Sequence, residues 1–414
     1  MEKSPSALVF YHYLHPDDVV SAVLFGELCR GLAERGWQVT ARPCNRSCRA
    51  DALSFSTKED WKGVRIERVR RPRFRQSSTV GRILNILWMQ AAWSLDAIRR
   101  RSTPDVLIIG TDPILSVLVA IVWKVLRPQT KIVHWCFDLF PEAAFSEGIL
   151  DRGSFGARFL QGITRRAYQC CDLIVDIGSC MRAQLKKYGS KARHVTLVPW
   201  ALEEPPEPLP VSQDERSHVF GDANLALMYS GSYGRAHSCS GLLMLARSLR
   251  QADAALAFSV RGNRVESLKN TLTAEDSNVR FVPFAPPDKL QERLASADIH
   301  VVSLREEWTG TVVPSKFFGA LAIGRPVLFF GSRRSSIAEL IETHAVGWIW
   351  DEENSGDVAD GLRNLSTNLT VMAELSRHCH AVYRQHFSRD ATLDQWDQQL
   401  RQTLGEDRLE IIRS

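Results

Sequence analysis

The feature that most constrains the fold of this chain is a regular alternation of short apolar runs with amphipathic segments. Apolar runs typical of buried strands occupy residues 7–13, 105–109, 131–136 and 172–176. Other segments, such as residues 19–35, carry apolar residues at helical spacing. Strands that alternate with helices in this way form a parallel sheet with helices on both faces.

A second alternating set follows a proline-rich segment. The stretch ALEEPPEPLPVSQDE, which begins at residue 201, is polar and contains four prolines, which is typical of a linker. The apolar runs beyond it are residues 225–229, 256–261, 279–283 and 299–304.

The two sets predict an α/β protein with two doubly wound, Rossmann-like domains, residues 1–203 and 204–389. The last segment, residues 390–414, is polar and helical, and we expect it to pack back on the first domain. Ligands of such parallel sheets bind beyond the carboxyl ends of the strands. We therefore expect the two domains to face each other across a ligand-binding cleft.

The composition excludes several classes of protein. An apolar share of 44% and a charged share of 24% are typical of a globular chain. No apolar run reaches the length of about 18–20 residues that a membrane-spanning helix needs, and the N-terminus lacks the apolar core of a signal peptide. The nine cysteines have neither disulfide nor zinc-ligand spacing, so we expect reduced thiols and a cytoplasmic protein.

One basic region accounts for the net charge of +5. Residues 62–101 contain eleven Lys or Arg and two acidic residues, so the rest of the chain is slightly acidic. A single local patch of this kind is not the composition of a nucleic-acid-binding protein. The region includes a helical segment with Trp88 and Trp93, and basic ends with Trp suit a helix on an anionic membrane surface. The alternative is a core-packed helix with one solvated end.

One motif in the second domain predicts an anion site. Residues 310–326, GTVVPSKFFGALAIGRP, favour a short helix over residues 315–323 that Gly324 ends. Free N–H groups at the start of such a helix attract anions, and Ser315 adds a hydroxyl. Lys316 would place a cation in the first turn, which is unfavourable unless an anion lies near. The alternative is an ordinary turn with a surface lysine.

The stretch YSGSYGRAH runs from an apolar strand into a glycine turn. Gly231, Ser232 and Gly234 let the backbone approach a ligand closely, and Arg235 and His237 follow them. The planar fork of an arginine suits phosphate oxygens. A tight strand-to-helix turn explains the stretch equally well by itself, but with the helix motif it gives two anion-seeking turns in one domain.

The stretch SVRGNR ends another strand of the second domain. It places Arg261 and Gly262 where a wall for a nucleobase or ribose would lie. A polar turn is an equally good explanation.

In the first domain, Asp138 follows the buried strand at residues 131–136. A carboxylate there would orient the hydroxyl of an acceptor or act as a base. The alternative is a turn aspartate or a helix cap. His134 falls inside the strand, where we expect a hydrogen-bonded core histidine.

The first loop of the chain gathers His12, His15, Asp17 and Asp18. One of the two aspartates is expected to cap the helix at residues 19–35. The histidines have no ligand partner at metal-binding spacing, so no metal site is predicted.

Taken in order, these motifs resemble those of the family-4 retaining glycosyltransferases with the GT-B fold. The resemblance covers nearly the whole chain and is greatest to the bacterial exopolysaccharide and O-antigen branch, which includes colanic-acid-type and N-acetylfucosamine transferases. VVSAVLFGELCRGLAERGWQVT resembles the first helix and second strand of the family, FDLFPE its first-domain active-site turn, and YSGSYGRAH its donor loop. VVPSKFFGALAIGRPVLFFG is the most specific match.

The resemblance implies transfer of a sugar from a nucleoside diphosphate to a hydroxyl group, with the anomeric configuration retained. The donor would bind the second domain. The acceptor, a lipid-linked saccharide at the inner face of the cytoplasmic membrane, would bind the first. The resemblance implies no metal ion and no cofactor, since the nucleotide sugar is a co-substrate.

The motifs and the resemblance together assign roles to residues. Asp138, Arg235 and Lys316 would be catalytic, and the two cations would carry the charge of the leaving diphosphate. The expected donor contacts are Gly231, Ser232, Gly234, His237, Arg261, Gly262, Glu307, Thr311, Val312, Val313 and Ser315. The expected acceptor contacts are His15, Asp17 and Asp18.

Two features depart from the family pattern. The family has two glutamates eight positions apart, and the corresponding residues here are Thr311 and Gly319. Glu306 or Glu307 would have to replace the first of them. A histidine that often precedes the aspartate of the first-domain turn is Phe137 here. These departures keep two alternatives open: a non-catalytic GT-B partner or scaffold protein, and a nucleotide-sugar epimerase.

Overall fold

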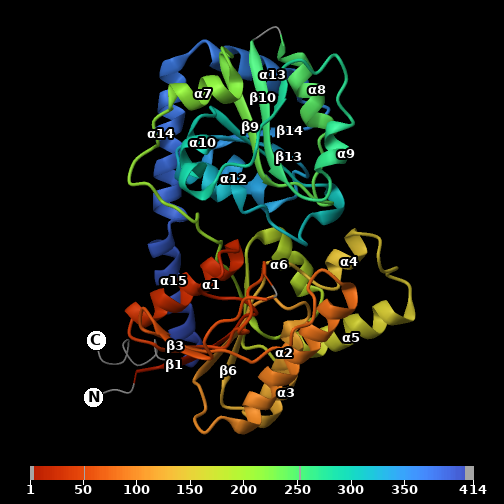
Figure 1. The fold of residues 1–414 in the computed structure, drawn as a ribbon, viewed down its shortest axis with the longest axis vertical. Coiled ribbons are helices and arrows are strands. Elements are labelled where there is room, and N and C mark those ends of the chain that lie inside the picture. The colour runs from red at the N-terminus through yellow and green to blue at the C-terminus, as the bar shows by residue number, and fades with distance from the viewer. Residues whose placement is uncertain (1–3, 51, 251–252, 406–414) are drawn as a thin grey trace. The chain divides into compact units, whose positions relative to one another are not determined.

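The computed structural model of the chain describes residues 4–50, 52–250 and 253–405. The chain divides into two compact units, Met1–Val198 with Asp390–Ser414 and Pro199–Arg389 (Figure 1). The part of the predicted C-terminal segment beyond residue 405 lies outside the described residues. Each unit contains one sheet flanked by helices, which is the α/β architecture that the sequence predicts.

The first unit contains an eight-stranded sheet within the described residues. Its strands are β1 (Ser6–Phe10), β2 (Gln38–Ala41), β3 (Lys58–Trp61), β4 (Val64–Glu67), β5 (Val106–Ile109), β6 (Lys131–Trp135), β7 (Leu173–Asp176) and β8 (Arg193–Thr196). Their order is β3-β4-β2-β1-β5-β6-β7-β8, and only the β3–β4 pair is antiparallel. The chain fills one side of β1 first and then crosses to the other, so the topological switch point lies between β1 and β5.

Helices cover both faces of this sheet. They are α1 (Val20–Glu34), α2 (Thr79–Arg99), η1 (Ser116–Leu118), α3 (Val119–Leu126), α4 (Glu142–Ser146), α5 (Phe155–Gln169), α6 (Ser179–Lys186) and α15 (Arg389–Leu404). On one face, Phe10 of β1 stacks on Trp93 of α2 with ring centroids 5.0 Å apart. On the other face, Trp135 of β6 meets Trp396 of α15 edge-on, also at 5.0 Å. Large aromatic rings therefore fill the core on both sides of the sheet.

Helix α15 is fixed to the first unit by packing and by hydrogen bonds. Leu393 fills the space beside Gly31 so closely that a Cβ at Gly31 would lie 2.5 Å from a Leu393 methyl carbon. The indole Nε1 of Trp37 donates to Asp397 at 2.6 Å, and Arg35 donates to Asp394 at 2.6 Å. The last turns of the chain thus complete a fold that begins with β1 and α1.

Two expectations for the first unit need correction. Helix α1 follows Val19, and no side chain caps it. Asp17 instead accepts hydrogen bonds from the Ser47 hydroxyl and the Cys48 N–H, both at 3.0 Å, because a tertiary contact competes with the local cap. Trp93 is fully buried and donates to the Arg42 carbonyl oxygen, so it is a core residue rather than an interfacial one.

The sheet of the second unit has six parallel strands within the described residues. They are β9 (Leu225–Ser232), β10 (Ala254–Arg261), β11 (Val279–Phe281), β12 (Ile299–Ser303), β13 (Val327–Phe330) and β14 (Gly347–Trp350). Their order is β11-β10-β9-β12-β13-β14, so the switch point lies between β9 and β12.

The helices of the second unit also cover both faces of its sheet. They are α7 (Gln213–Phe220), α8 (Ser240–Ser248), α9 (Val265–Lys269), η3 (Pro287–Lys289), α10 (Leu290–Ala295), η4 (Glu306–Trp308), α11 (Lys316–Ala322), α12 (Ser336–His344), α13 (Ser355–Ser366) and α14 (Leu369–His386). Leucines of α8 and α13 pack on one face of β9 and β10, and α7 and α10 cover the small residues of the opposite face. Alternate side chains of each strand thus point into the two layers.

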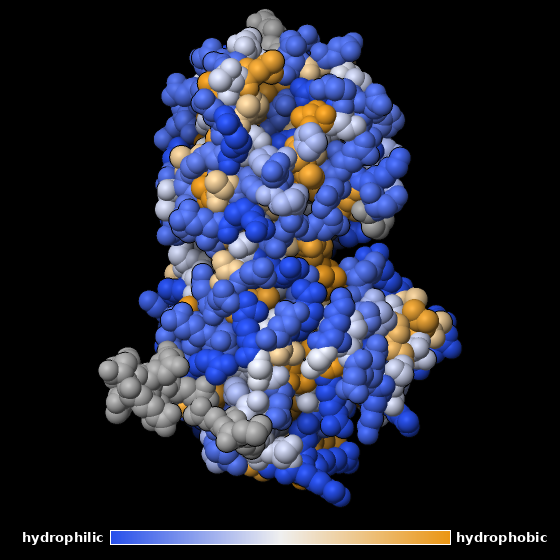
Figure 2. Space-filling model, turned by 90° about the vertical axis from the view of Figure 1, so that its left-hand side faces the viewer, coloured by the Kyte–Doolittle hydropathy of each residue, from blue (hydrophilic) through white to orange (hydrophobic). Residues whose placement is uncertain are grey.

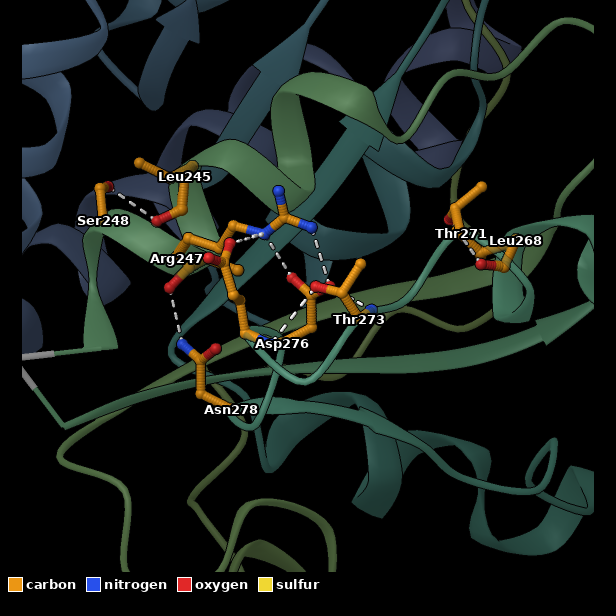
Figure 3. Close-up of polar contacts among 10 residues, drawn as sticks. Leu245, Arg247, Ser248, Leu268, Thr271, Thr273, Asp276 and Asn278 are labelled. Atoms are coloured by element: carbon orange, nitrogen blue, oxygen red, sulfur yellow. Dashed lines mark hydrogen bonds and ion pairs between the residues drawn. The ribbon is translucent and has the colours of Figure 1, made fainter.

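A polar network ties α8 to the loop before β11 (Figure 3). The guanidinium of Arg247 donates to both carboxylate oxygens of Asp276, at 2.7 and 2.9 Å. Asp276 also accepts from the backbone N–H of Thr273 at 2.8 Å. The hydrogen bond from Arg247 holds the pKa of Asp276 down at about 2. Arg247 and Asp276 neutralise each other's charge, so we assign the network a structural role.

The linker is fixed to the second unit by a buried arginine. Arg325 follows Gly324, which has a φ of +76° and ends α11 as the sequence predicts. The guanidinium of Arg325 donates to the carbonyl oxygens of Leu209, Ala295 and Ala297, each at 2.8 Å. The proline-rich segment is therefore an ordered part of the second unit.

The surface is mainly hydrophilic on the face that Figure 2 shows, with apolar residues scattered among polar ones. Within the described residues, no helix combines the length and apolar character that crossing a bilayer requires. All nine cysteines are free, as their spacing predicts.

The packing of α15 leads to a test of stability. Replacing the fully buried Trp396 by Ala removes its contact with Trp135 and leaves a cavity, so the free energy of unfolding should fall by about 3–5 kcal/mol. Urea unfolding followed by circular dichroism measures the change. The exposed Gln398 on the same helix provides the control, because its change to Ala should cost less than about 0.5 kcal/mol. Equal losses in the two variants would contradict this account of α15.

Candidate functional site

Lys316 lies at the switch point of the second sheet. Its ammonium nitrogen is 3.8 Å from the centre of the Tyr229 ring, and it donates to the carbonyl oxygen of Ser232 at 3.4 Å. Tyr229 and Ser232 belong to β9, and Lys316 begins α11, which follows β12. Because β9 and β12 are neighbours in the sheet, the fold brings together two motifs that are 84 positions apart in the sequence.

The charge on Lys316 has no carboxylate partner among the described residues. Burial lowers the pKa of its ammonium to about 7. The side chain as a whole is only half-buried, so a ligand can reach it from solvent. Removing an ion from water without a counter-ion is costly, and an anion bound beside Lys316 would remove that cost. The site is therefore suited to hold an anion.

His237 lies beside this cation and is neutral. Its Nδ1 is 2.7 Å from the carbonyl oxygen of Ser303, the last residue of β12, and must carry the proton to donate there. Burial, and then the charge of Lys316, lower the pKa of His237 to about 4. Because Nδ1 carries the proton, Nε2 is an acceptor, and it can accept a hydrogen bond from a hydroxyl group.

Two of the predicted glycines have backbone conformations that require glycine. Gly231 has a φ of +113°, and a Cβ there would lie 3.9 Å from the Lys316 nitrogen. Gly262 has a φ of +140°, and a Cβ there would lie 2.3 Å from the Tyr233 carbonyl oxygen. These glycines allow the ends of β9 and β10 to approach each other beside the cation.

The other predicted residues of these turns lie at the surface. Arg235 is exposed in the turn after β9, and the neighbouring Gly234 is half-buried. The Arg261 guanidinium lies 4.7 Å from the centre of the Phe284 ring. Ser315 is exposed and precedes α11 without capping it through its side chain. The structure places these residues on the loops that surround the switch point.

The segment between β12 and α11 contains the remaining predicted donor residues. Thr311 and Val313 are buried and Val312 is half-buried, and the N–H of Thr311 donates to the Trp308 carbonyl oxygen at 2.9 Å. Glu307 accepts from Arg305 at 3.2 Å.

The two positions at which the chain departs from the resembled family differ in their surroundings. No atom lies within 4 Å of a Cβ built on Gly319, so a side chain there would meet open space. Thr311, in contrast, is buried. Glu306 is ion-paired with Arg334.

In the first unit, three polar residues follow three neighbouring strands. His12 comes after β1, Asp112 after β5 and Asp138 after β6. The first strand ends at Phe10, before the predicted residue 13, because the N–H of His12 turns to donate to the Asp112 carbonyl oxygen at 3.0 Å. The imidazole Nδ1 of His12 is also 3.3 Å from the Asp112 carboxylate. These residues mark the switch point of the first sheet.

Their charges are coupled. Burial alone would lower the pKa of His12, but the charge of Asp112 and a hydrogen bond to it raise the pKa to about 9. Burial, and then the charge of Asp112, raise the pKa of Asp138 to about 6, although its side chain is accessible to solvent. Asp138 can therefore hold or release a proton near neutral pH, which suits a group that interacts with a hydroxyl.

The predicted acceptor residues have other partners. The His15 ring stacks on Trp61 with centroids 4.6 Å apart. Asp17 is buried against Ser47, as described above, and Asp18 forms an exposed ion pair with Arg49 at 3.0 Å. Among the described residues, no contact links any of these three side chains to Asp138.

The remaining predictions concern His134 and metal ligands. The Nδ1 of His134 is 2.8 Å from the Ile109 carbonyl oxygen, and burial lowers its pKa to about 4, as expected of a core histidine. Across the described part of the chain, no three His, Cys, Asp or Glu side chains are arranged to hold a metal ion.

The sequence does not predict the parts played by Tyr229, Ser303 and Asp112. Ser303 is the last residue of β12 and Asp112 follows β5, each beside a switch point, whereas Tyr229 lies within β9. For Ser303 and Asp112 that position is the signal that would identify them, but it requires the strand order to be known.

Both halves of the chain match glycosyltransferase families. Residues 21–201 match the family described as "Glycosyl transferase 4-like domain", and residues 226–368 match "Glycosyl transferases group 1". The chain is 26% identical over 284 residues to "Probable glycosyltransferase WbjE" of Pseudomonas aeruginosa, an alignment that covers 67% of this chain and 70% of that protein.

Solved structures with the GT-B fold are similar over nearly the whole chain. Sucrose-phosphate synthase of Thermosynechococcus elongatus aligns with a TM-score of 0.69 at 15% identity, over 98% of this chain and 100% of that one. HepE of Anabaena, solved in complex with UDP, aligns with a TM-score of 0.62 at 13% identity, over 96% and 99%. WaaG, a glycosyltransferase involved in lipopolysaccharide biosynthesis, aligns with a TM-score of 0.61 at 18% identity, over 94% and 98%. These likenesses show the fold.

The coupling of His12 to Asp112 can be measured. In the Asp112→Asn variant, burial acts without the compensating charge, so the pKa of His12 should fall from about 9 to below its ordinary value of 6.5. NMR titration of the imidazole reports this change.

The same variant should lose stability in a defined pH range. A raised histidine pKa stabilises the folded state fully below about pH 6.5, and this stabilisation disappears as the pH rises through about 9. The loss of unfolding free energy in Asp112→Asn should therefore be larger near pH 6 than above pH 9. The exposed Asp60→Asn serves as control. A His12 pKa that does not move would disprove the coupling.

Proposed function

From the premise that this chain is a glycosyltransferase with the GT-B fold, we propose that it moves a sugar from a nucleoside diphosphate to a hydroxyl group and retains the anomeric configuration. The observation that supports this most is the ammonium of Lys316, which lies at the switch point of the second sheet without a counter-ion among the residues that the structure describes. Ligands of parallel sheets bind at this place, and a diphosphate supplies the missing negative charge.

In the proposed reaction, the second unit stabilises the leaving group. As the bond between sugar and diphosphate breaks, negative charge grows on the phosphate oxygen, and Lys316 lies ready to neutralise it. We assign this work to Lys316, supported by Arg235 from the adjacent turn, and not to a metal ion. His237 would accept a hydrogen bond from a hydroxyl of the sugar or ribose through Nε2. Lys316 and His237 are already positioned by contacts within the protein. They would therefore need little reorganisation during the reaction.

The first unit would bind the acceptor. Asp138 can accept a hydrogen bond from the attacking hydroxyl and so orient it. The leaving diphosphate takes the proton of that hydroxyl in this proposal, so the protein needs no nucleophile. Burial is the larger cause of the raised pKa of Asp138 and the charge of Asp112 adds to it, so Asp112 would act through Asp138.

We further propose that the acceptor is a lipid-linked saccharide of a surface polysaccharide and that the protein works at the cytoplasmic membrane face. Residues 62–101 carry the positive charge that anionic lipid attracts. Large apolar side chains of α2, among them Val80, Ile83 and Leu87, are more than half exposed. Exposed apolar residues beside basic ones are typical of a surface that contacts a membrane.

The role of Lys316 leads to a test by mutation. Lys316→Ala should lower the rate of nucleotide-sugar turnover by about 100–1000-fold, because the charge that stabilises the leaving group is lost. Release of nucleoside diphosphate from a panel of UDP-, GDP- and dTDP-sugars, with and without a chelator, measures the rate. Lys269→Ala, which removes an exposed lysine from the same unit, should change it little. Sugar release at an undiminished rate in Lys316→Ala would refute the proposed role. Product analysis separates transfer from epimerisation, and no turnover of any nucleotide sugar by the wild type would favour a scaffold.

The pKa of Lys316 predicts how the affinity for the diphosphate depends on pH. A bound diphosphate requires the charged ammonium, but the free protein loses that proton above about pH 7. The affinity for UDP should therefore fall by up to about tenfold per pH unit between about pH 7.5 and 9, where the terminal phosphate of UDP is already ionised. Isothermal titration calorimetry measures this slope. The slope should vanish in Lys316→Ala, and an equal slope in that variant would show that another group titrates.

A further inference from the structure

The loop before α2 presents arginine side chains on a fixed backbone. This loop, with the sequence RRPRFRQSS at residues 70–78, contains four arginines, and no acidic residue occurs between residues 68 and 95. The indole Nε1 of Trp88 donates to the Arg70 carbonyl oxygen at 2.9 Å, and the amide of Asn85 donates to the Phe74 carbonyl oxygen at 3.1 Å. Both donors belong to α2, so the loop lies along the first turns of that helix.

The contact at the start of α2 is especially close. A Cβ built on Gly81 would lie 2.1 Å from the Arg75 carbonyl oxygen, so only glycine permits this approach. The Ser78 side chain accepts from the Gly81 N–H and caps the helix. With the backbone held in this way, the side chains of Arg73 and Arg75 are exposed, and neither has an ion-pair partner among the described residues.

These side chains border a cavity. Ala52, Arg73, Arg75 and Ser77 line an open pocket of about 570 Å³. Two guanidinium groups and a hydroxyl around one pocket are the donors that phosphate oxygens prefer. The volume is large enough for a diphosphate together with part of the group attached to it.

An exposed apolar stripe begins where the pocket ends. Val80, Ile83, Leu84 and Leu87 are 68%, 51%, 39% and 58% exposed, and their spacing places them on one face of α2. Leu95 and Ile98 continue the stripe toward the end of the helix, at 40% and 64% exposure. The opposite face of α2, which includes Met89 and Trp93, is already buried in the core. The stripe is therefore a second apolar face without a partner in this unit among the described residues.

We propose that the pocket binds the diphosphate of a lipid diphosphate and that the stripe holds its hydrocarbon chain. The occupant follows from charge and shape together: the pocket suits a compact polyanion, and the stripe that leads away from it suits a linear apolar chain. This proposal rests on the proposed function, for which it names the part of the acceptor that the first unit recognises. The proposal places the lipid diphosphate site on α2, separate from Asp138. The hydrocarbon chain of the acceptor would anchor it there, while the sugar of the acceptor reaches the carboxyl ends of the strands of the first sheet.

The test uses farnesyl diphosphate as a probe, with farnesol and inorganic pyrophosphate as its two halves. The wild type should bind farnesyl diphosphate at least tenfold more tightly than either half, because each half lacks one set of contacts. The double variant Arg73→Gln/Arg75→Gln should bind it at least tenfold more weakly. The matched control Arg99→Gln/Arg101→Gln removes the same charge from exposed residues at the other end of α2 and should bind it like the wild type.

The stripe is tested in the same way. Ile83→Ser/Leu87→Ser should weaken binding of farnesyl diphosphate but not of pyrophosphate, whereas Val125→Ser/Leu126→Ser, which changes exposed residues of α3, should affect neither. Thermal unfolding confirms that each variant is folded. Equal losses of farnesyl diphosphate binding in the pocket variant and its arginine control would reduce the site to general electrostatic attraction and overturn the proposal.

The outcome is separable from the proposed function. Hydrolysis of nucleotide sugars by the wild type without any lipid tests the function alone. If hydrolysis occurs but farnesyl diphosphate does not bind, only the lipid diphosphate site is wrong. If farnesyl diphosphate binds as described but no nucleotide sugar reacts, the site stands and the proposed function fails.

Discussion

The positive charge of Lys316 over the ring of Tyr229 is the interaction on which the proposed chemistry of the second unit depends. The negative face of an aromatic ring offsets part of the cost of desolvating an ammonium, by about 0.5–1 kcal/mol at exposed sites and about 2 kcal/mol where the cation is desolvated. It does not neutralise the charge, and burial still lowers the pKa to about 7. The ring therefore compensates only part of the desolvation cost of the Lys316 ammonium. An anion bound beside Lys316 would compensate the rest. The crossing of the chain between β9 and β12 creates this position, because it leaves room at the ends of two neighbouring strands.

The switch point of the first unit contains carboxylates, whereas that of the second unit contains a cation. Asp112 gives His12 a partner, so that pair is stable without a ligand. Burial raises the pKa of Asp138, and the negative charge of Asp112 raises it further, to about 6. Burial and one neighbouring carboxylate together thus bring the pKa of Asp138 close to neutral pH. A parallel sheet permits this arrangement because the carboxyl ends of β1, β5 and β6 lie side by side.

The sequence predicts the strands with clear apolar runs, such as β1, β6 and β12, and the end of α11 at Gly324, because these depend on local patterns and on glycine conformation. It does not predict the short strands β3, β4 and β14. It also singles out Lys316 as a candidate, since a cation in a first helical turn is unfavourable unless an anion lies near. It cannot identify Tyr229 as the partner of Lys316, because that contact joins two elements that are far apart in the sequence. The hydrogen bond from Lys316 to Ser232 of the same strand spans 84 positions. The expected cap at Asp17 fails for a related reason: Ser47 and Cys48 compete for the carboxylate, and neither is near it in sequence.

Helix α2 shows most clearly where periodicity stops being informative. An amphipathic helix normally buries its one apolar face, and a pattern of this kind usually predicts the core. In α2, apolar residues occur on two faces, and the sequence alone does not say which face is inside. The structure decides the matter through Trp93 and Met89, which are fully buried, so the face with Ile83 and Leu87 must remain outside. A soluble monomer gains nothing from such a face, and its exposure costs solubility. Its position directly after a rigid arginine loop gives it a use, since a charged head and an apolar chain in one ligand would satisfy both features at once.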